Sequence, residues 1–143
     1  QNENLIHTLD NSIEELYIKK SLHFFNKLYS NSEKNLKIVF TSLHGTSYKL
    51  IPKLLKKTGF SELKLVDKQM IPDGNFTHAK SSNPEDKLAL IDAIEIAKKN
   101  NSDLVIGTDP DADRFGIVVK DFNDDFIQIN VNQSMILLTE FLL

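Results

Sequence analysis

Three aspartates alternate in one short segment of the sequence, and their spacing indicates a site for a hard metal ion. The segment reads GTDPDADR and places carboxylates at Asp109, Asp111 and Asp113. Three carboxylates held this close repel one another, and one takes up a proton unless a cation neutralises the group. Oxygen ligands of this kind favour Mg²⁺, Ca²⁺ or Mn²⁺. The sequence therefore predicts a divalent-metal loop at residues 107–114.

The residue that closes the segment, Arg114, is the one arginine among the 17 lysines and arginines of the chain. In a chain that uses lysine at every other such position, an arginine indicates a need for the planar guanidinium and its fork of donors. Such a fork binds carboxylate or phosphate oxygens in pairs. We therefore expect position 114 to depend on the guanidinium fork rather than on a positive charge alone.

An EF-hand calcium loop and a solvated acidic turn are the alternatives for alternating aspartates. An EF-hand needs glycine at its sixth position and glutamate at its twelfth. Counted from Asp109, these positions hold Arg114 and Lys120. A plain acidic turn explains neither the sole arginine nor the predicted strands on both sides, so we favour the metal loop.

A second segment, TSLHGTS at residues 41–47, joins a predicted strand to a predicted helix. A helix that begins here would direct free backbone N–H groups at an anion. An ordinary strand-to-helix turn with Ser47 as the helix cap explains the same residues. The segment alone leaves both interpretations open.

Short β-branched and aromatic runs alternate with segments of helical periodicity along the chain. We expect strands at 36–41, 63–66, 103–107, 115–119 and 126–129, and helices at 12–29, 47–57, 83–100 and 131–143. Ser12 with Glu15 predicts a capping box for the first helix, and Pro84 fits the first turn of the third.

This alternation predicts an α/β fold, a three-layer α/β/α sandwich whose sheet is mainly parallel but mixed by a hairpin between the last two strands. Ligands of such sheets bind beyond the carboxyl ends of the strands. The loops 42–47, 67–84 and 107–114 should therefore meet at one edge.

The composition fits a globular domain that binds neither nucleic acid nor membrane. The chain has 143 residues, 41% of them apolar and 26% charged, and a net charge of −3, which gives no basic surface for nucleic acid or anionic lipid. The absence of cysteine excludes disulfides and thiolate metal sites. No apolar run reaches the roughly 20 residues of a membrane span, and no signal peptide is recognisable. We therefore expect a cytoplasmic protein.

The ends of the sequence suggest part of a longer polypeptide, because it begins at Gln1 without methionine and stops inside an apolar run. We predict an N-terminal helix and lead-in at 1–35, an α/β/α domain at 36–130, and the start of a connection to a further domain at 131–143.

Four segments carry a resemblance to a known family. They read FTSLHGTSYKLIPKLLKKTGF, IPDGNF, SSNPED and GTDPDADRFGIVVK, in this order over residues 36–120, and the tail VNQSMILLTEFLL follows. In these segments the sequence resembles the second domain of the α-D-phosphohexomutase superfamily, the phosphoglucomutases and phosphomannomutases. The form LHGT together with DGNF is most similar to the branch with bacterial α-phosphoglucomutases and phosphopentomutases.

The resemblance implies a four-domain enzyme whose reactive phosphoserine, sugar-reading loop and phosphate-binding loop lie in other domains of the same polypeptide. It implies movement of phosphate between C1 and C6 of a sugar phosphate, with Mg²⁺ as cofactor and a hexose bisphosphate as intermediate and activator. The matching motifs imply site residues of three kinds. They are the metal ligands Asp109, Asp111 and Asp113, the catalytic residues Arg114 and His44, and the phosphate-lining residues Gly45 and Thr46.

Three alternatives stay open. The first is a phosphopentomutase of the same superfamily. The second is a different Mg²⁺-dependent phosphotransferase or phosphatase, but such enzymes commonly need an aspartate nucleophile at the end of the first strand, where the residues 40–42 read FTS. The third is a non-catalytic α/β domain whose acidic loop binds Ca²⁺ or a partner protein. Conversion between sugar 1- and 6-phosphates separates a mutase from the last two.

Overall fold

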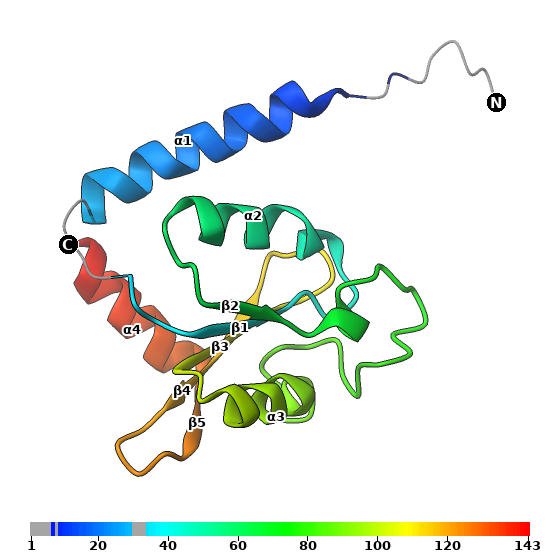
Figure 1. Cartoon of the computed structure of the whole chain (residues 1–143), viewed down its shortest axis with the longest axis vertical. Coiled ribbons are helices and arrows are strands. Elements are labelled where there is room, and N and C mark those ends of the chain that lie inside the picture. The colour runs from blue at the N-terminus through cyan, green and yellow to red at the C-terminus, as the bar shows by residue number, and fades with distance from the viewer. Residues whose placement is uncertain (1–6, 8, 30–33) are drawn as a thin grey trace. The chain divides into compact units, whose positions relative to one another are not determined.

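The predicted strands form one five-stranded mixed sheet in the order β2-β1-β3-β4-β5 (Figure 1). The computed structural model describes residue 7 and residues 9–29 and 34–143. The strands are β1 (Ile38–Thr41), β2 (Leu63–Leu65), β3 (Leu104–Thr108), β4 (Phe115–Lys120) and β5 (Phe126–Ile129). β2 and β3 run parallel to β1, whereas β4 is antiparallel to both β3 and β5. The predicted α/β fold class with a mixed sheet is confirmed. The antiparallel part comes from β4, which pairs with β3 as well as with its predicted hairpin partner β5.

Within the unit that holds the sheet, two helices lie on opposite faces of the strands (Figure 1). The described helices are α1 (Asn11–Tyr29), α2 (Leu50–Lys57), α3 (Ile91–Asn100) and α4 (Val131–Leu142). Two right-handed crossovers that run in opposite directions across a sheet place their helices on opposite faces. In Figure 1, α2 and α3 accordingly lie on opposite sides of β1 and its neighbours, which gives the expected α/β/α layers.

The core lies where α3 packs on the central strands. Every residue of β1 is buried, as a continuous apolar run predicts for a strand covered on both faces. Ala93 and Ala97 are fully buried, and their small side chains let α3 approach the sheet closely. The cluster is completed by Val39, Leu43, Val66, Ala89, Leu90, Val105 and Val118.

The third helix begins at Ile91, eight residues later than the predicted start at residue 83. Asn83 and Asp86 use their side chains to accept the backbone N–H groups of Glu85 and Leu88. Short polar side chains that bond their own backbone in this way compete with a helix. The segment therefore forms successive turns, and the apolar spacing before Ile91 does not produce a helical face. Its predicted end is confirmed, because Asn101 adopts a left-handed conformation with φ of 49°.

The predicted capping box of the first helix is wrong. The helix begins at Asn11, and Asp10 accepts the backbone N–H of Ser12 at 2.9 Å. Ser12 therefore lies inside the first turn, and Asp10 provides the cap. The side chain of Ser12 and then this backbone hydrogen bond lower the pKa of Asp10.

The chain divides into two compact units, Gln1–Glu33 and Lys34–Leu143. The described helix of the first unit is α1, and the second unit holds the sheet with α2, α3 and α4. The boundaries at residues 35 and 130 stay a prediction. Within the described ranges, no helix is long and apolar enough to cross a membrane.

Candidate metal centre and its supporting loops

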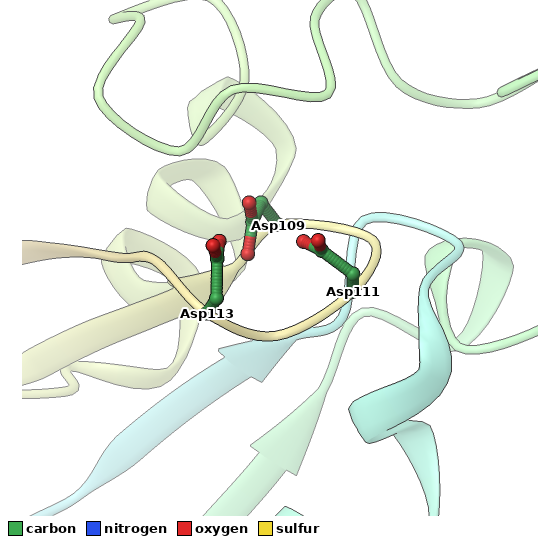
Figure 2. A group of neighbouring side chains, drawn as sticks. All are labelled: Asp109, Asp111 and Asp113. Atoms are coloured by element: carbon green, nitrogen blue, oxygen red, sulfur yellow. The ribbon is translucent and has the colours of Figure 1, made fainter.

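The three alternating aspartates lie together in the loop between β3 and β4. One carboxylate oxygen from each of Asp109, Asp111 and Asp113 lies within 4.8 Å of the other two. Figure 2 shows the three carboxylates gathered on one side of the loop. Asp109 is 1% exposed, whereas Asp111 and Asp113 are open to solvent. The cluster thus combines one fixed carboxylate with two accessible ones.

The backbone of the loop closes on Asp109. The N–H of Ala112 donates to the Asp109 carbonyl at 3.1 Å, and the N–H of Asp109 donates to the Arg114 carbonyl at 3.2 Å. Ala112 adopts a left-handed conformation with φ of 63°, which costs an alanine about 1–2 kcal/mol. The tight turn brings Asp111 and Asp113 back toward Asp109.

Arg114 holds the buried carboxylate of Asp109 with two donors. Its backbone N–H donates to Oδ1 at 2.9 Å, and its Nε donates to Oδ2 at 2.9 Å. The same Nε lies 3.7 Å from Oδ1 of Asp113. The side chain of Arg114 is 52% exposed. Among the described residues, the side chain of Arg114 contacts Asp109 and Asp113 through Nε, and the negative charge of Glu85 also acts on the guanidinium.

The contacts within the cluster lower the pKa of Asp109 and raise the pKa of Asp113. Burial by itself would raise the pKa of Asp109, but hydrogen bonds from the backbone and side chain of Arg114 outweigh it and lower this pKa. The pKa of Asp113 is raised, first by its contact with the Asp109 carboxylate and then by the negative charge of Asp111. Carboxylates that resist joint ionisation are stabilised by a cation. Three oxygen donors suit Mg²⁺, Ca²⁺ or Mn²⁺.

The turn at residues 42–47 braces the aspartate loop, which confirms the expected meeting of these two segments at one sheet edge. The N–H of Thr46 donates to the carbonyl of Pro110 at 2.8 Å, and the Thr46 hydroxyl contacts the same oxygen. Ser47 and Thr108 share a buried hydrogen bond of 2.5 Å between their hydroxyls. Ser47 is therefore not the cap of α2, which begins only at Leu50 after a 3₁₀ turn.

Gly45 is required by the close approach of the two loops, and we expect Gly45→Ala to disturb both. A Cβ at Gly45 would lie 2.6 Å from the Pro110 carbonyl oxygen and would also overlap its Cα. Because the obstacle is backbone, the loops must separate, at a cost of about 1–3 kcal/mol. Urea unfolding should show this loss. Gly74→Ala is the matched control, since a Cβ there meets nothing within 4 Å; equal loss in both variants would contradict the steric explanation.

His44 faces the opposite way, toward the long segment that follows β2. It is 5% exposed. Its Nδ1 lies 2.7 Å from the carbonyl oxygen of Ile71, and its Nε2 accepts the N–H of His78 at 3.1 Å. The structure therefore places Gly45 and Thr46 against the aspartate loop, and the ring of His44 against residues 71–78.

Gln69 is a supporting residue that the sequence did not indicate. It is 1% exposed. Its side-chain oxygen accepts the hydroxyl of Thr41 at 2.7 Å, and its Nε2 donates to the His78 carbonyl at 2.7 Å. Its own carbonyl accepts the N–H of His44 and the hydroxyl of Ser42. A lone glutamine in a loop carries no sequence signal for such a role, because its partners lie 9 to 28 residues away.

Asp73 organises the tip of the same segment, and we expect its carboxyl group to stay ionised far into acid. The Thr77 hydroxyl and the backbone N–H groups of Asn75 and Thr77 lower its pKa to about 2. A pKa below the unfolded value means that this stabilisation is complete above about pH 4 and is lost as the pH falls through about 2. Carboxyl ¹³C NMR titration should give this midpoint. Thr77→Val should raise it, and an unchanged midpoint would contradict the assigned cause.

The fold and the aspartate loop define an α/β/α domain with a candidate metal loop between its third and fourth strands. A crystal structure from Burkholderia thailandensis, a phosphoglucomutase/phosphomannomutase family protein, shares this fold with a TM-score of 0.72 and 23% sequence identity, over 91% of this chain and 26% of that one.

Sequence comparison identifies the family. The model of the phosphoglucomutase/phosphomannomutase alpha/beta/alpha domain II matches residues 15–123, and the chain belongs to this family. It is 42% identical to a phosphoglucomutase of Staphylococcus aureus strain N315 over 141 residues, and 40% identical to that of strain USA300. Each match covers 99% of this chain and 25% of the relative, so the chain spans about a quarter of the length of these relatives.

Proposed function

We propose that the chain is the metal-binding domain of a phosphoglucomutase, an enzyme that moves phosphate between C1 and C6 of a hexose phosphate. The observation that carries the proposal is the aspartate loop itself. In a chain similar to phosphoglucomutases over almost its whole length, three carboxylates converge beside the sole arginine. This combination suits phosphoryl transfer, because catalysis of that reaction rests on positioning and on neutralising the charge of the transferred group.

The donor set fits Mg²⁺, which we propose as the resident metal. Asp109, Asp111 and Asp113 would hold it through carboxylate oxygens, the ligands that hard cations prefer. Bound there, Mg²⁺ would neutralise charge on the oxygens of a phosphoryl group. Since the loop offers few protein ligands, we expect weak binding by the isolated chain, about millimolar or weaker.

Arg114 would orient the phosphoryl group. Its Nε is fixed on Asp109, which directs the outer edge of the guanidinium away from the buried carboxylate. A fork of donors held in this way can bind two oxygens of one phosphoryl group. Gly45 and Thr46 would line the same space from the neighbouring turn, because both contact Pro110 of the aspartate loop.

The remaining parts of the reaction are assigned to other domains of a polypeptide as long as the relatives. We propose that a phosphoserine in such a domain donates the phosphoryl group, that a hexose bisphosphate is the intermediate and activator, and that residues 131–143 begin the connection onward. We also propose a cytoplasmic location, since charged sugar phosphates do not cross membranes unaided.

The experiment is an assay of the complete polypeptide for conversion of glucose 1-phosphate to glucose 6-phosphate, with and without Mg²⁺. Mannose and pentose phosphates run in parallel identify a phosphomannomutase or a phosphopentomutase. The 143-residue chain alone should be inactive. Turnover by this chain alone, or a complete protein inert toward every sugar phosphate, would contradict the proposal.

A further inference from the structure

The segment between β2 and α3 runs from residue 66 to residue 90 with only one short 3₁₀ turn, Asp67–Gln69, as regular structure. A connection this long inside a compact domain is uncommon unless it is functional. Two buried side chains fasten its first half to the rest of the unit. One is Gln69, which belongs to the segment and accepts the hydroxyl of Thr41 at the end of β1, and the other is His44, which reaches the segment from the turn after β1.

The hydrogen bonds of His44 allow only one protonation state. The carbonyl oxygen of Ile71 can only accept, so Nδ1 must carry the hydrogen of that 2.7 Å bond. The backbone N–H of His78 can only donate, so Nε2 must offer its lone pair. Both bonds form together only in the neutral ring with its proton on Nδ1. A second proton, on Nε2, would face the hydrogen of His78 N–H.

The backbone of His44 is fastened to the same segment. Its N–H donates to the Gln69 carbonyl at 2.8 Å, and its carbonyl accepts the N–H of Asp73 at 3.3 Å. Leu43 and His44 both adopt left-handed conformations, with φ of 46° and 65°. Such conformations cost about 1–3 kcal/mol each and persist only where the surrounding structure imposes them. Four hydrogen bonds between His44 and residues 69–78, two from its backbone and two from its ring, hold His44 in this conformation.

The same turn touches the aspartate loop on its other side. The residues that follow His44 are Gly45, which lies against Pro110, and Thr46, which donates to the Pro110 carbonyl. A shift of the turn at His44 must therefore move its contacts with Pro110, one residue from both Asp109 and Asp111.

We propose that His44 is a positioning residue, held as the neutral Nδ1–H tautomer, which fixes residues 69–78 to the turn 42–47 and so sets the position of the aspartate loop. It transfers no proton to substrate. This replaces the catalytic role that the sequence motif implied for His44, because proton transfer at either ring nitrogen would require one of the two bonds to break. The effect on catalysis rests on the proposed mutase function, whereas the tautomer and the loop attachment do not.

The first test needs no substitution. Long-range ¹H–¹⁵N NMR of the labelled chain at neutral pH distinguishes a protonated from an unprotonated ring nitrogen. We expect a protonated Nδ1 and an unprotonated Nε2 at His44. A proton on Nε2, or rapid averaging between the two tautomers, would overturn the proposal.

The second test measures hydrogen exchange at the His78 amide and the affinity of the aspartate loop for Mn²⁺. His44→Ala should speed exchange of this amide by about tenfold or more, since it loses its acceptor, and should weaken Mn²⁺ binding by about three- to tenfold. His44→Gln, which can place an acceptor near Nε2, should restore part of both. The matched control is His78→Ala, which removes the other ring of this pair but keeps the backbone N–H. Equal effects of His44→Ala and His78→Ala would refute a role for the His44 ring bonds.

The third test uses the complete mutase. We expect His44→Ala to lower kcat/KM by about threefold to thirtyfold, His44→Asn or His44→Gln to recover part of it, and the pH profile of each active variant to keep its shape. Loss of one limb of the profile, with no recovery in the amide variants, would show that His44 transfers a proton and would refute the proposal. A complete protein without mutase activity would contradict the proposed function. The first two tests, which use the 143-residue chain, would still decide the tautomer of His44 and its hold on the loop.

Discussion

In the complete polypeptide, assayed for the proposed mutase activity, Arg114→Lys is expected to lower kcat by about tenfold to a thousandfold, the range for losing one oriented donor at a developing charge. Lysine keeps the positive charge and can still reach Asp109. It cannot donate to Asp109 and at the same time present two further donors in a fixed plane. Nε of Arg114 donates to Oδ2 of Asp109 at 2.9 Å, so the proposed contact with a phosphoryl group would use the outer edge of the guanidinium.

The fold should not change in this variant. Arg114 is half-exposed, and the backbone N–H that donates to Oδ1 of Asp109 is present in lysine too. Urea unfolding of the chain should therefore give nearly the same midpoint for Arg114→Lys and the parent. Lys64→Arg, an exposed exchange on β2, controls for the exchange of the two cations. A normal kcat for Arg114→Lys would leave the arginine only the task of holding Asp109.

The aspartate loop could be predicted from the sequence because its information is local. Three carboxylates, a proline and an arginine lie within six residues, and the strands on both sides are apolar runs. Spacing therefore indicates the cluster without knowledge of the fold. The spacing does not show that Asp109 is buried while Asp111 and Asp113 are exposed. Burial of Asp109 results from packing at the end of β3, next to the turn after β1.

The predicted start of α3 at residue 83 is wrong because two local signals conflict. The apolar spacing favours a helix, whereas short polar side chains favour turns, and the structure has turns. The apolar spacing from Leu88 onward favours a helix from residue 83, with Pro84 in its first turn. The side chains of Asn83 and Asp86 instead bond the N–H groups two residues ahead. Pro84 is buried, and its carbonyl accepts the side chain of Gln128 on β5, a contact that no local pattern could reveal.

The position of His44 could not be predicted for the same reason. The motif placed it in the turn after the first strand, where a cleft-facing role is the natural interpretation. Its ring partners, Ile71 and His78, lie 27 and 34 residues away in a segment without periodicity. Sequence spacing predicts which residues share a turn, but it does not predict which neighbouring loop a buried polar side chain will bond.

Because Asp109 is buried and Asp111 is exposed, we expect Asp111→Ala and Asp109→Ala to differ in their effects on stability and on metal binding. Asp111 is exposed and would serve the metal alone. Its removal should weaken Mg²⁺ or Mn²⁺ binding by about ten- to a hundredfold, since even residues behind the direct ligands have effects of that size. Excess Mg²⁺ should then restore part of the mutase rate. The metal-free chain should lose no stability, because the substitution also removes a negative charge that acts against ionised Asp113.

Asp109→Ala should lose stability as well as metal, and excess Mg²⁺ should not restore its rate. The substitution leaves the backbone N–H of Arg114 without its acceptor inside the loop, which costs about 1–3 kcal/mol, while the half-exposed guanidinium can turn to water and adds little. With Nε released, the guanidinium of Arg114 would lose the fixed orientation that the proposed contact with a phosphoryl group requires. Urea unfolding without metal, Mn²⁺ titration and the Mg²⁺ dependence of kcat measure the three effects separately. Unchanged metal affinity in Asp111→Ala would refute the metal loop, and equal stability of the two variants would refute the structural share assigned to Asp109.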